Sequence, residues 1–385
     1  MRNILIHSGG TYGDVFPFLA VGKELRRRGH RVTMVTNCVF EERVTRLGLE
    51  FVSCDTPAEY RSFLHHSAGM CDVGGAARFV DDYFVPRILP ELKLLLDHVR
   101  RDALIITSAI TSWPAIMAAE RTGTEIASVY LSPSYAAGIP GELELLESVD
   151  GRINQVRATI GLSENTDWKQ FLLAPQHHLA AWPAWFAEVD PSWLVRPIPV
   201  GFMHDQEAES VGSDENADRF INSGEPPVLI SGGSSRFIRP TFYVAAAAAC
   251  KGRRALLVAP EPSLVPTSLP PTIAAFPPLP FAGIVPRVQA VVHHGGYGIS
   301  VRALASAKPQ MILAAGADRP DNGRRLESLG VARTFEEADW DPERLRHALD
   351  ELLSSAQVGE RCVHWANKLK LEPQGATGIA DLFGL

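Results

Sequence analysis

The stretch Ala290-Val-Val-His293-His294-Gly295-Gly296-Tyr297-Gly298 decides how the chain folds. Its pattern is a buried strand, a glycine-rich turn and the start of an apolar-faced helix. Such a turn lets the backbone approach a ligand closely, and the helix N-terminus adds free N–H groups and a partial positive charge. The stretch therefore predicts a phosphate or diphosphate site. The alternative is that His293 and His294 are packing residues beside a plain turn.

The same strand, glycine loop and helix pattern occurs at two other places. Residues 3–7 lead into the loop 8–14, and residues 228–231 lead into Gly232-Gly233-Ser234-Ser235. Strands and helices then alternate along most of the chain, which is typical of parallel sheets with helices on both faces. The sequence therefore predicts a duplicated α/β architecture.

The length of 385 residues is more than one ordinary hydrophobic core supports, so we expect two domains. A polar stretch that ends in two prolines predicts the boundary between them. The expected organisation is a first domain over 1–203, a linker over 204–225, a second domain over 226–365 and a helical segment over 366–385.

The composition indicates a globular protein that does not have nucleic acid as its main partner. Apolar residues make up 46% and charged residues 21%, and the net charge of −7 is the wrong sign for binding phosphate backbones. No apolar run reaches the roughly 18 residues that a membrane span needs. The five cysteines are scattered and odd in number, which predicts a reducing, cytoplasmic location and no disulfide framework or zinc site.

Residues 291–298, V-V-H-H-G-G-Y-G, resemble the donor-site signature of the family 1 glycosyltransferases, whose members include antibiotic, macrolide and sterol glycosyltransferases. Further segments resemble the family in the right order: Gly13-Asp14-Val15-Phe16-Pro17, residues 276–286 and Asp318-Arg319-Pro320. The resemblance implies the GT-B fold, in which two Rossmann-like domains with parallel sheets face each other across a cleft. The first domain would bind the acceptor and the second the donor, and in similar proteins the final segment crosses back onto the first domain.

The implied activity is inverting, metal-independent transfer of a sugar from a UDP- or dTDP-sugar to a hydroxyl of a small molecule, in bacterial secondary metabolism such as antibiotic biosynthesis. The implied partners are that nucleotide-sugar donor and the acceptor, with no cofactor and no metal. Two other classes stay open: a nucleotide-sugar 2-epimerase of GT-B fold, and a non-catalytic glycosyltransferase-like partner protein. The sequence does not distinguish UDP from dTDP, a monomer from a homodimer, or one acceptor from another, and it does not tell whether a partner protein is needed.

Asp14 matches the position of the family's general base, which takes the proton from the acceptor hydroxyl. Its place after a glycine-rich loop at the end of a sheet strand is where open α/β sheets bind ligands. The alternative is that Asp14 only caps a helix over 16–28. The later strand that carries a partner acid in many relatives ends here in Ile106-Thr107-Ser108, so we expect no His–Asp dyad.

The family's diphosphate-binding positions correspond to Ser234, His294, Gly295, Gly296, Gly298 and Ile299. Ile299 stands where the family has Thr or Ser, so one hydroxyl contact is lost although the backbone N–H remains. Leu279 and Phe281 lie in the segment that resembles the family's nucleotide base-binding segment.

The segment that faces the donor sugar in the family begins here at Asp318 and Arg319. Arg319 replaces a Gln, which leaves two interpretations: it pairs with Asp318 or Asp321 and shapes the loop, or it contacts an altered sugar or the phosphates. Arg302 replaces a family acid that binds ribose, so the nucleoside preference is also open. Asp339-Trp340-Asp341 imitates a metal-binding D-x-D motif, but Pro342 after it predicts that Asp341 is a helix N-cap.

Overall fold

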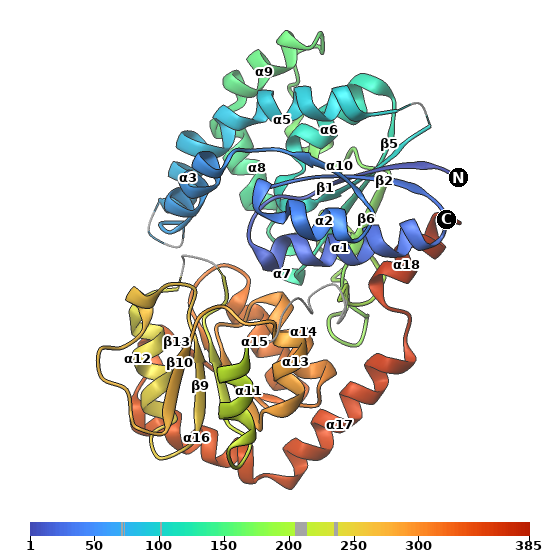
Figure 1. Ribbon diagram of the computed structural model, residues 1–385. Coiled ribbons are helices and arrows are strands. Elements are labelled where there is room, and N and C mark those ends of the chain that lie inside the picture. Colours follow the sequence, from blue (N-terminus) through green and yellow to red (C-terminus); the bar gives the residue numbers. More distant parts are fainter. Residues whose placement is uncertain (71, 73, 101, 205–213, 235–237) are drawn as a thin grey trace. The chain divides into compact units, whose positions relative to one another are not determined.

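The computed structural model describes residues 1–70, 72, 74–100, 102–204, 214–234 and 238–385. The chain forms two compact units, one of residues 1–203 with 374–385 and the other of residues 204–373. Each unit holds a parallel β-sheet with helices on both faces, which confirms the predicted α/β class with two Rossmann-like domains (Figure 1). Residues 205–213 of the expected linker, and Ser235, lie outside the described residues.

The sheet of the first unit has the strand order β3-β2-β1-β4-β5-β6-β7. The order runs outward in one direction from β1 and in the other from β4, so the switch point lies between these two strands. Its central strands are buried along nearly their whole length, as expected for a parallel sheet covered on both faces. The strands are β1 (Asn3–His7), β2 (Arg31–Thr36), β3 (Glu50–Ser53), β4 (Leu104–Ser108), β5 (Glu125–Tyr130), β6 (His177–Ala180) and β7 (Ile198–Pro199).

Helices α1 and α2 cover one face of this sheet, and α5 and α6 cover the other (Figure 1). Helix α1 ends where Gly29 takes a φ of +88°, a left-handed conformation that suits glycine. The helices are α1 (Tyr12–Arg27), α2 (Glu41–Arg46), α3 (Pro57–Ser67), α4 (Gly75–Phe79), α5 (Val85–His98), α6 (Trp113–Thr122), α7 (Pro133–Ala137), α8 (Ile139–Ser148), α9 (Asp150–Thr159), α10 (Trp168–Leu173) and α18 (Gly375–Leu382).

The sheet of the second unit has the strand order β10-β9-β8-β11-β12-β13, with its switch point between β8 and β11. Successive side chains point to opposite faces: Val228 and Ile230 belong to one apolar cluster, and Leu229 between them belongs to the other. The strands are β8 (Val228–Ser231), β9 (Ala255–Val258), β10 (Ile273–Phe276), β11 (Ala290–His293), β12 (Gln310–Ala314) and β13 (Ala332–Glu336).

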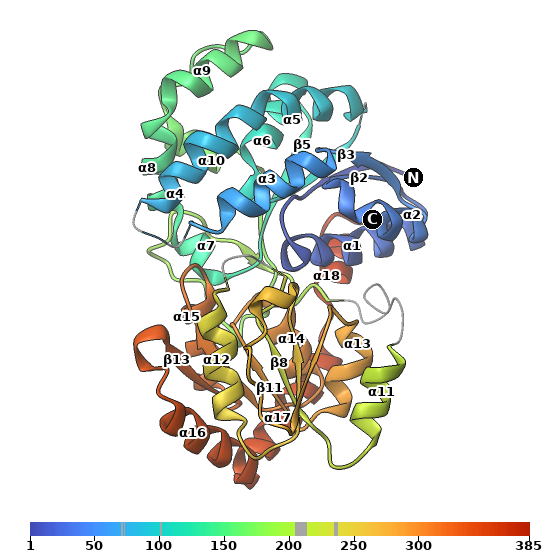
Figure 2. The same ribbon diagram turned by 60° about the vertical axis from the view of Figure 1, so that its left-hand side comes forward.

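Helices α12 and α16 pack on one face of the second sheet, and α11, α13 and α14 pack on the other (Figure 2). The helices are α11 (Glu215–Asn222), α12 (Pro240–Ala249), α13 (Phe281–Ile284), α14 (Tyr297–Ala305), α15 (Arg319–Ser328), α16 (Pro342–Ser354) and α17 (Ala356–Leu371). The boundary expected at residue 365 falls inside α17, because this helix continues to Leu371 without a break.

The last helix, α18, belongs to the first unit and packs against α1. Two of its glycines allow close approach to the backbone after β7: a Cβ at Gly378 would lie 2.5 Å from the Val200 carbonyl oxygen. Arg28 then holds the end of the chain, because it donates to the Asp381 carboxylate at 2.7 Å and to the Leu385 backbone oxygen at 2.6 Å.

Candidate functional site

The two loops at the switch point of the second sheet meet around one side chain, His294. The loop after β8 contains Gly232-Gly233-Ser234, and the loop after β11 contains His294-Gly295-Gly296. Because β8 and β11 are hydrogen-bonded neighbours, their carboxyl ends place both loops at the same edge of the sheet. Open α/β sheets bind their ligands at this kind of edge.

His293, the last residue of β11, is a structural side chain. It is fully buried, its Nδ1 accepts a hydrogen bond from the Gly295 N–H at 3.1 Å, and its Nε2 lies 2.9 Å from Gln310 Oε1. Nδ1 therefore carries no proton, and Nε2 donates to the amide oxygen. Burial lowers the pKa of His293 to about 4, so the ring is neutral and serves to fix the turn. For this residue, the packing alternative considered from the sequence is correct.

His294 lies in a slot between two glycines. A Cβ at Gly233 would lie 2.5 Å from His294 Cε1, and a Cβ at Gly296 would lie 2.4 Å from His294 Nε2. Gly233 also has a φ of +80°, which disfavours any other residue there. The imidazole therefore occupies space that only the absence of two side chains provides.

The His294 imidazole is neutral. Its residue is only 9% exposed, and burial lowers its pKa well below the usual value, with a further contribution from the positive charge of Arg319. Its Nδ1 is buried without a well-aligned hydrogen-bond partner among the described residues, and an interaction with the Ser231 backbone opposes the pKa shift only in part. A neutral ring with unused hydrogen-bonding capacity is suited to donate one N–H to an anionic ligand.

The N-terminus of helix α14 lies directly after this slot. Gly296 is its N-cap, and the Ser300 N–H donates to the Gly296 carbonyl oxygen at 3.1 Å, so the positive end of the helix dipole lies beside the slot. The Ile299 side chain packs into the apolar cluster with Leu229 and Val291. Only the backbone N–H of this residue is therefore left for contact with a ligand at the helix start. A Cβ at Gly298 would meet no atom within 4 Å, so this position borders open space.

Ser234 is the third residue after β8 and is partly exposed. The loop is fixed upstream of it, where the Gly233 N–H donates to Ser231 Oγ at 3.1 Å. The structure thus brings Ser234 to the same sheet edge as the loop after β11.

Asn322 connects the predicted sugar-binding segment to the glycine turn. Its Nδ2 donates to Asp318 Oδ2 at 2.7 Å and to the Gly295 carbonyl oxygen at 3.1 Å. Asn322 is buried, and no role was assigned to it from the sequence, where it is one polar residue in an ordinary helix start. The two hydrogen bonds place Asp318 next to the predicted diphosphate loop.

Arg319 has a loop-shaping contact. The residue is 4% exposed, and its Nη1 donates to the Ala315 carbonyl oxygen at 2.7 Å, which closes the turn before α15. Asp321, one of the two acids that Arg319 was expected to pair with, forms its ion pair with Arg325 Nε at 2.8 Å. A contact between Arg319 and the sugar or phosphates stays a prediction, as does the role of Arg302, which is also buried.

Leu279 and Phe281, the predicted base-binding residues, lie after β10. Leu279 is in the connecting segment, and Phe281 is the first residue of helix α13. Both are partly buried and pack against the apolar cluster that also holds Ile299. Their exposed portions leave apolar surface at the start of helix α13.

In the first unit, Asp14 is held at the start of helix α1 by the residue that caps this helix. Thr11, not Asp14, is the N-cap, and the helix begins at Tyr12, earlier than expected. Asp14 Oδ2 accepts from the Thr11 N–H at 2.7 Å and from Thr11 Oγ1 at 3.0 Å. Asp14 is thus the third helical residue of a capping box, a position that leaves the carboxyl group partly exposed.

A histidine–acid pair lies at the switch point of the first sheet, although β4 itself ends without an acid. His7 Nδ1 lies 3.1 Å from Thr107 Oγ1, and His7 Nε2 lies 3.5 Å from Glu91 Oε2. The acid comes from helix α5 and was not predicted, because nothing in the sequence relates Glu91 to β1.

Aromatic side chains gather on the helices after β3, where the sequence left open an acceptor wall or simple packing. Phe63 of α3 contacts Phe79 and Tyr83, with ring centroids 6.2 and 5.7 Å apart.

The Glu142 carboxyl group of helix α8 has a buried hydrogen-bond partner: Trp113 Nε1 donates to Glu142 Oε1 at 2.7 Å. Burial raises the pKa of Glu142 to about 7, although the Trp113 hydrogen bond opposes the shift.

Asp341 is the N-cap of α16, as predicted: its carboxylate accepts from the Arg344 N–H at 2.8 Å. Among the described residues, no group of three His, Cys, Asp or Glu side chains is arranged to hold a metal ion. Within the residues that the structure describes, no helix is long and apolar enough to cross a membrane.

Comparison with known families matches both ends of the chain. Residues 4–126 match the glycosyltransferase family 28 N-terminal domain, and residues 258–383 match the C-terminal domain of proteins like erythromycin biosynthesis protein CIII. Among curated relatives, O-mycaminosyltylonolide 6-deoxyallosyltransferase of Streptomyces fradiae is 27% identical over 84% of this chain and 83% of its own length. Oleandomycin glycosyltransferase of Streptomyces antibioticus is 27% identical over 93% and 85%.

Solved structures show the same fold over the whole chain. The glycosyltransferase of kitacinnamycin has a TM-score of 0.74 at 21% identity, covering 99% of this chain and 98% of its own. The spinosyn rhamnosyltransferase in complex with thymidine diphosphate has a TM-score of 0.70 at 16% identity, covering all of both chains. The chain therefore belongs to the GT-B glycosyltransferases of the antibiotic and macrolide type, and it is a glycosyltransferase.

The slot around His294 predicts the effect of one added methyl group. In Gly296→Ala the backbone stays relaxed, since Gly296 has an ordinary φ of −66°, but the new Cβ displaces the His294 ring. We expect the Kd for thymidine diphosphate, measured by calorimetry, to rise about tenfold through loss of one charge-assisted hydrogen bond. Gly359→Ala, whose Cβ meets no atom within 4 Å on α17, is the matched control. Equal affinity in the two variants would contradict the slot.

The raised pKa of Glu142 predicts a pH-dependent stability. Between pH 4.5 and 7 the unfolded chain has lost this proton and the folded chain keeps it, so the contribution of Glu142 to stability falls as pH rises. Glu142→Gln keeps an acceptor for Trp113 but does not titrate. Its advantage in unfolding free energy should grow by about 1–3 kcal/mol from pH 4.5 to pH 7, allowing for partial exposure.

Thermal and urea unfolding at both pH values would measure this difference. Glu144→Gln, on the exposed surface of the same helix, controls for the loss of a surface charge. A difference between Glu142→Gln and the wild type that stays constant with pH would contradict the prediction.

Proposed function

We propose that the protein transfers a sugar, with inversion, from a dTDP- or UDP-sugar to a hydroxyl of a small molecule of bacterial secondary metabolism. The observation that carries the proposal is the neutral His294 ring in its glycine slot, directly before the N-terminus of α14. That arrangement suits a diphosphate leaving group. Two neighbours in fold were crystallised with thymidine diphosphate, which favours the thymidine nucleotide.

On the acceptor side, Asp14 is the general base of the proposed reaction. Its carboxylate takes the proton from the acceptor hydroxyl while that oxygen forms a bond to the anomeric carbon from the face opposite the diphosphate. The bond between the anomeric carbon and the diphosphate oxygen breaks at the same time. The carbon is thereby inverted, and the proton ends on Asp14.

On the donor side, the departing diphosphate gains negative charge as its bond to the sugar breaks. A His294 N–H, the first N–H groups of α14 and the Ser234 hydroxyl are donors fixed in advance, so they stabilise that charge without reorganisation. Asp318, placed by Asn322, accepts hydrogen bonds from sugar hydroxyls. In the proposed reaction these groups stabilise the leaving diphosphate and hold the sugar without a metal ion.

The acceptor is proposed to be an apolar small molecule bearing a hydroxyl. The aromatic cluster of Phe63, Phe79 and Tyr83 supplies the kind of surface that such a molecule binds. The two curated relatives are named for macrolide substrates, which supports this class. The four described cysteines are free, which fits a cytoplasmic enzyme.

Asp14→Asn tests the base directly. The amide keeps an oxygen for the Thr11 hydrogen bonds but accepts no proton, so we expect transfer to fall by about 10²–10⁴-fold. The Kd for dTDP should not change, because the predicted nucleotide-binding residues all belong to the other unit. Transfer would be measured by mass spectrometry with a panel of dTDP- and UDP-sugars and polyketide acceptors.

Full activity of Asp14→Asn would refute the base assignment. Conversion of a nucleotide-sugar in the absence of any acceptor, without release of dTDP or UDP, would favour a 2-epimerase. Absence of nucleotide binding in the wild-type protein would favour a non-catalytic partner protein.

A further inference from the structure

Three loops meet at one edge of the first sheet, next to Asp14. The strand order β3-β2-β1 puts the carboxyl ends of these strands side by side. Gly10 follows β1, Asn37 follows β2 and Asp55 follows β3, so residues far apart in the sequence come together there.

A chain of hydrogen bonds joins the three loops. Asn37 Nδ2 donates to Asp55 Oδ2 at 2.7 Å, and Asn37 Oδ1 accepts from the Gly10 N–H at 2.8 Å. The polarity of this chain is fixed by its nitrogen donors, because the Gly10 N–H and the Asn37 Nδ2 can only donate. Asp55 therefore orients the Asn37 amide, and the amide oxygen in turn holds the Gly10 backbone.

Gly10 is in direct contact with the catalytic carboxylate. A Cβ at Gly10 would lie 2.5 Å from Asp14 Oδ2, and the residue has a φ of +132°. The next residue, Thr11, donates two hydrogen bonds to that same oxygen. A shift of the backbone at Gly10 and Thr11 thus moves the Asp14 carboxylate.

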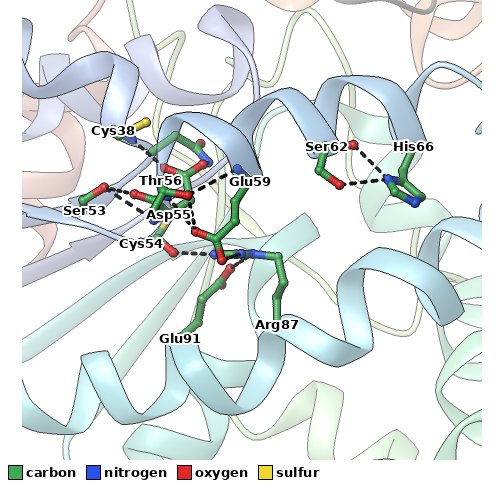
Figure 3. Close-up of polar contacts among 11 residues, drawn as sticks. Cys38, Ser53, Cys54, Asp55, Thr56, Glu59, Ser62, His66, Arg87 and Glu91 are labelled. Atoms are coloured by element: carbon green, nitrogen blue, oxygen red, sulfur yellow. Dashed lines mark hydrogen bonds and ion pairs between the residues drawn. The ribbon is translucent and has the colours of Figure 1, made fainter.

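Asp55 is itself held from the other side. It is 8% exposed, Asn37 is 5% exposed, and Asp55 Oδ1 accepts from the Cys38 N–H at 2.7 Å. The carbonyl oxygen of the preceding Cys54 accepts from Arg87, whose guanidinium also contacts Glu59 and Glu91 (Figure 3).

A buried carboxylate contributes little to the free energy of folding, because the cost of removing it from water offsets much of the energy of its hydrogen bonds. Its geometry has a clearer consequence. The Asp55 carboxylate accepts from Asn37 Nδ2 and from the Cys38 N–H, both directly after β2, and Asn37 in turn holds the Gly10 backbone.

We propose that Asp55 and Asn37 are positioning residues for Asp14, acting through the Gly10 backbone. The proposal rests on the proposed role of Asp14 as the base. Misplacing a catalytic group by about 1 Å costs as much as 10²-fold in rate. Loss of the Asp55–Asn37–Gly10 connection should therefore lower kcat while the donor remains bound.

The test uses Asn37→Ala and Asp55→Asn in the full-length protein. We expect kcat to fall about 10- to 100-fold in each, with the KM for the acceptor and the Kd for dTDP within twofold of wild type. Asn37→Ser, which retains a small polar group, serves if Asn37→Ala does not fold. In the Asp14→Asn background, Asn37→Ala should produce no further loss, because the group through which it acts is gone.

The matched control is Thr33→Val. Thr33 Oγ1 donates to Glu50 Oε2 at 3.1 Å, so this variant also removes a polar contact between β2 and β3, but at the opposite end of the strands. We expect it to lose stability and keep kcat. Hydrogen exchange of the amides of residues 8–14 supplies a readout independent of catalysis, and it should rise in Asn37→Ala but not in Thr33→Val.

The outcomes separate the two proposals. If Asp14→Asn is inactive while Asn37→Ala and Asp55→Asn keep wild-type kcat and wild-type exchange, the positioning inference is wrong and the base assignment stands. If Asp14→Asn is fully active, the base assignment fails, and faster exchange in Asn37→Ala would then report only a loop contact. An equal loss of kcat in Thr33→Val would show a general effect of stability and would overturn the inference.

Discussion

The proposed donor-binding unit depends on one packing constraint: the loops after β8 and β11 must pass close to the two sides of the His294 imidazole. Because a Cβ at Gly233 or at Gly296 would overlap the ring, both loops lack side chains at the points of contact. The same close packing removes the ring from water, which keeps it neutral. A charged, solvated imidazole at this place would need neither glycine. The slot thus explains the glycines, the burial and the protonation state together.

The proposed acceptor-binding unit holds its predicted base, Asp14, by a different physical means. There the group is a carboxylate that is partly exposed, as the proposed role of proton acceptor requires, and it is held by donors from the helix start. Hydrogen bonds from Thr11 orient it, and buried polar residues of two neighbouring loops fix the backbone that provides them. The second unit therefore fixes a neutral imidazole by packing, and the first unit fixes a carboxylate by hydrogen bonding.

Much of the fold could be predicted from the sequence because its signals are local. Glycine loops after short apolar strands mark both sheet switch points, and Asp341 with Pro342 marks a helix start. Strands β6, β7 and β13 were not predicted. His177–Ala180 and Ile198–Pro199 are short edge segments, and Ala332–Glu336 carries exposed polar residues, so none has a clear apolar pattern.

The site residues likewise fall into those with a local sequence signal and those without one. Asp14, His294 and the glycines lie within contiguous motifs, whereas Asp55, Asn37 and Asn322 act through contacts that only the folded chain creates. Asn37 is one strand connection away from Asp14 and Asp55 is two, and no spacing rule links them. Even the position of Asp14 needed the structure, because the sequence does not distinguish an N-cap from the third residue of a capping box.

The central claim, that a neutral His294 held between two glycines meets the diphosphate, is tested most directly by nitrogen-15 NMR of the histidine side chains. The His294 resonances would be assigned by comparison with His294→Gln and followed from pH 5 to pH 8, with and without saturating dTDP. The account predicts a neutral ring over the whole range and a clear shift when dTDP binds. A ring that is charged at pH 6, or one whose resonances do not change while dTDP is bound, would contradict it.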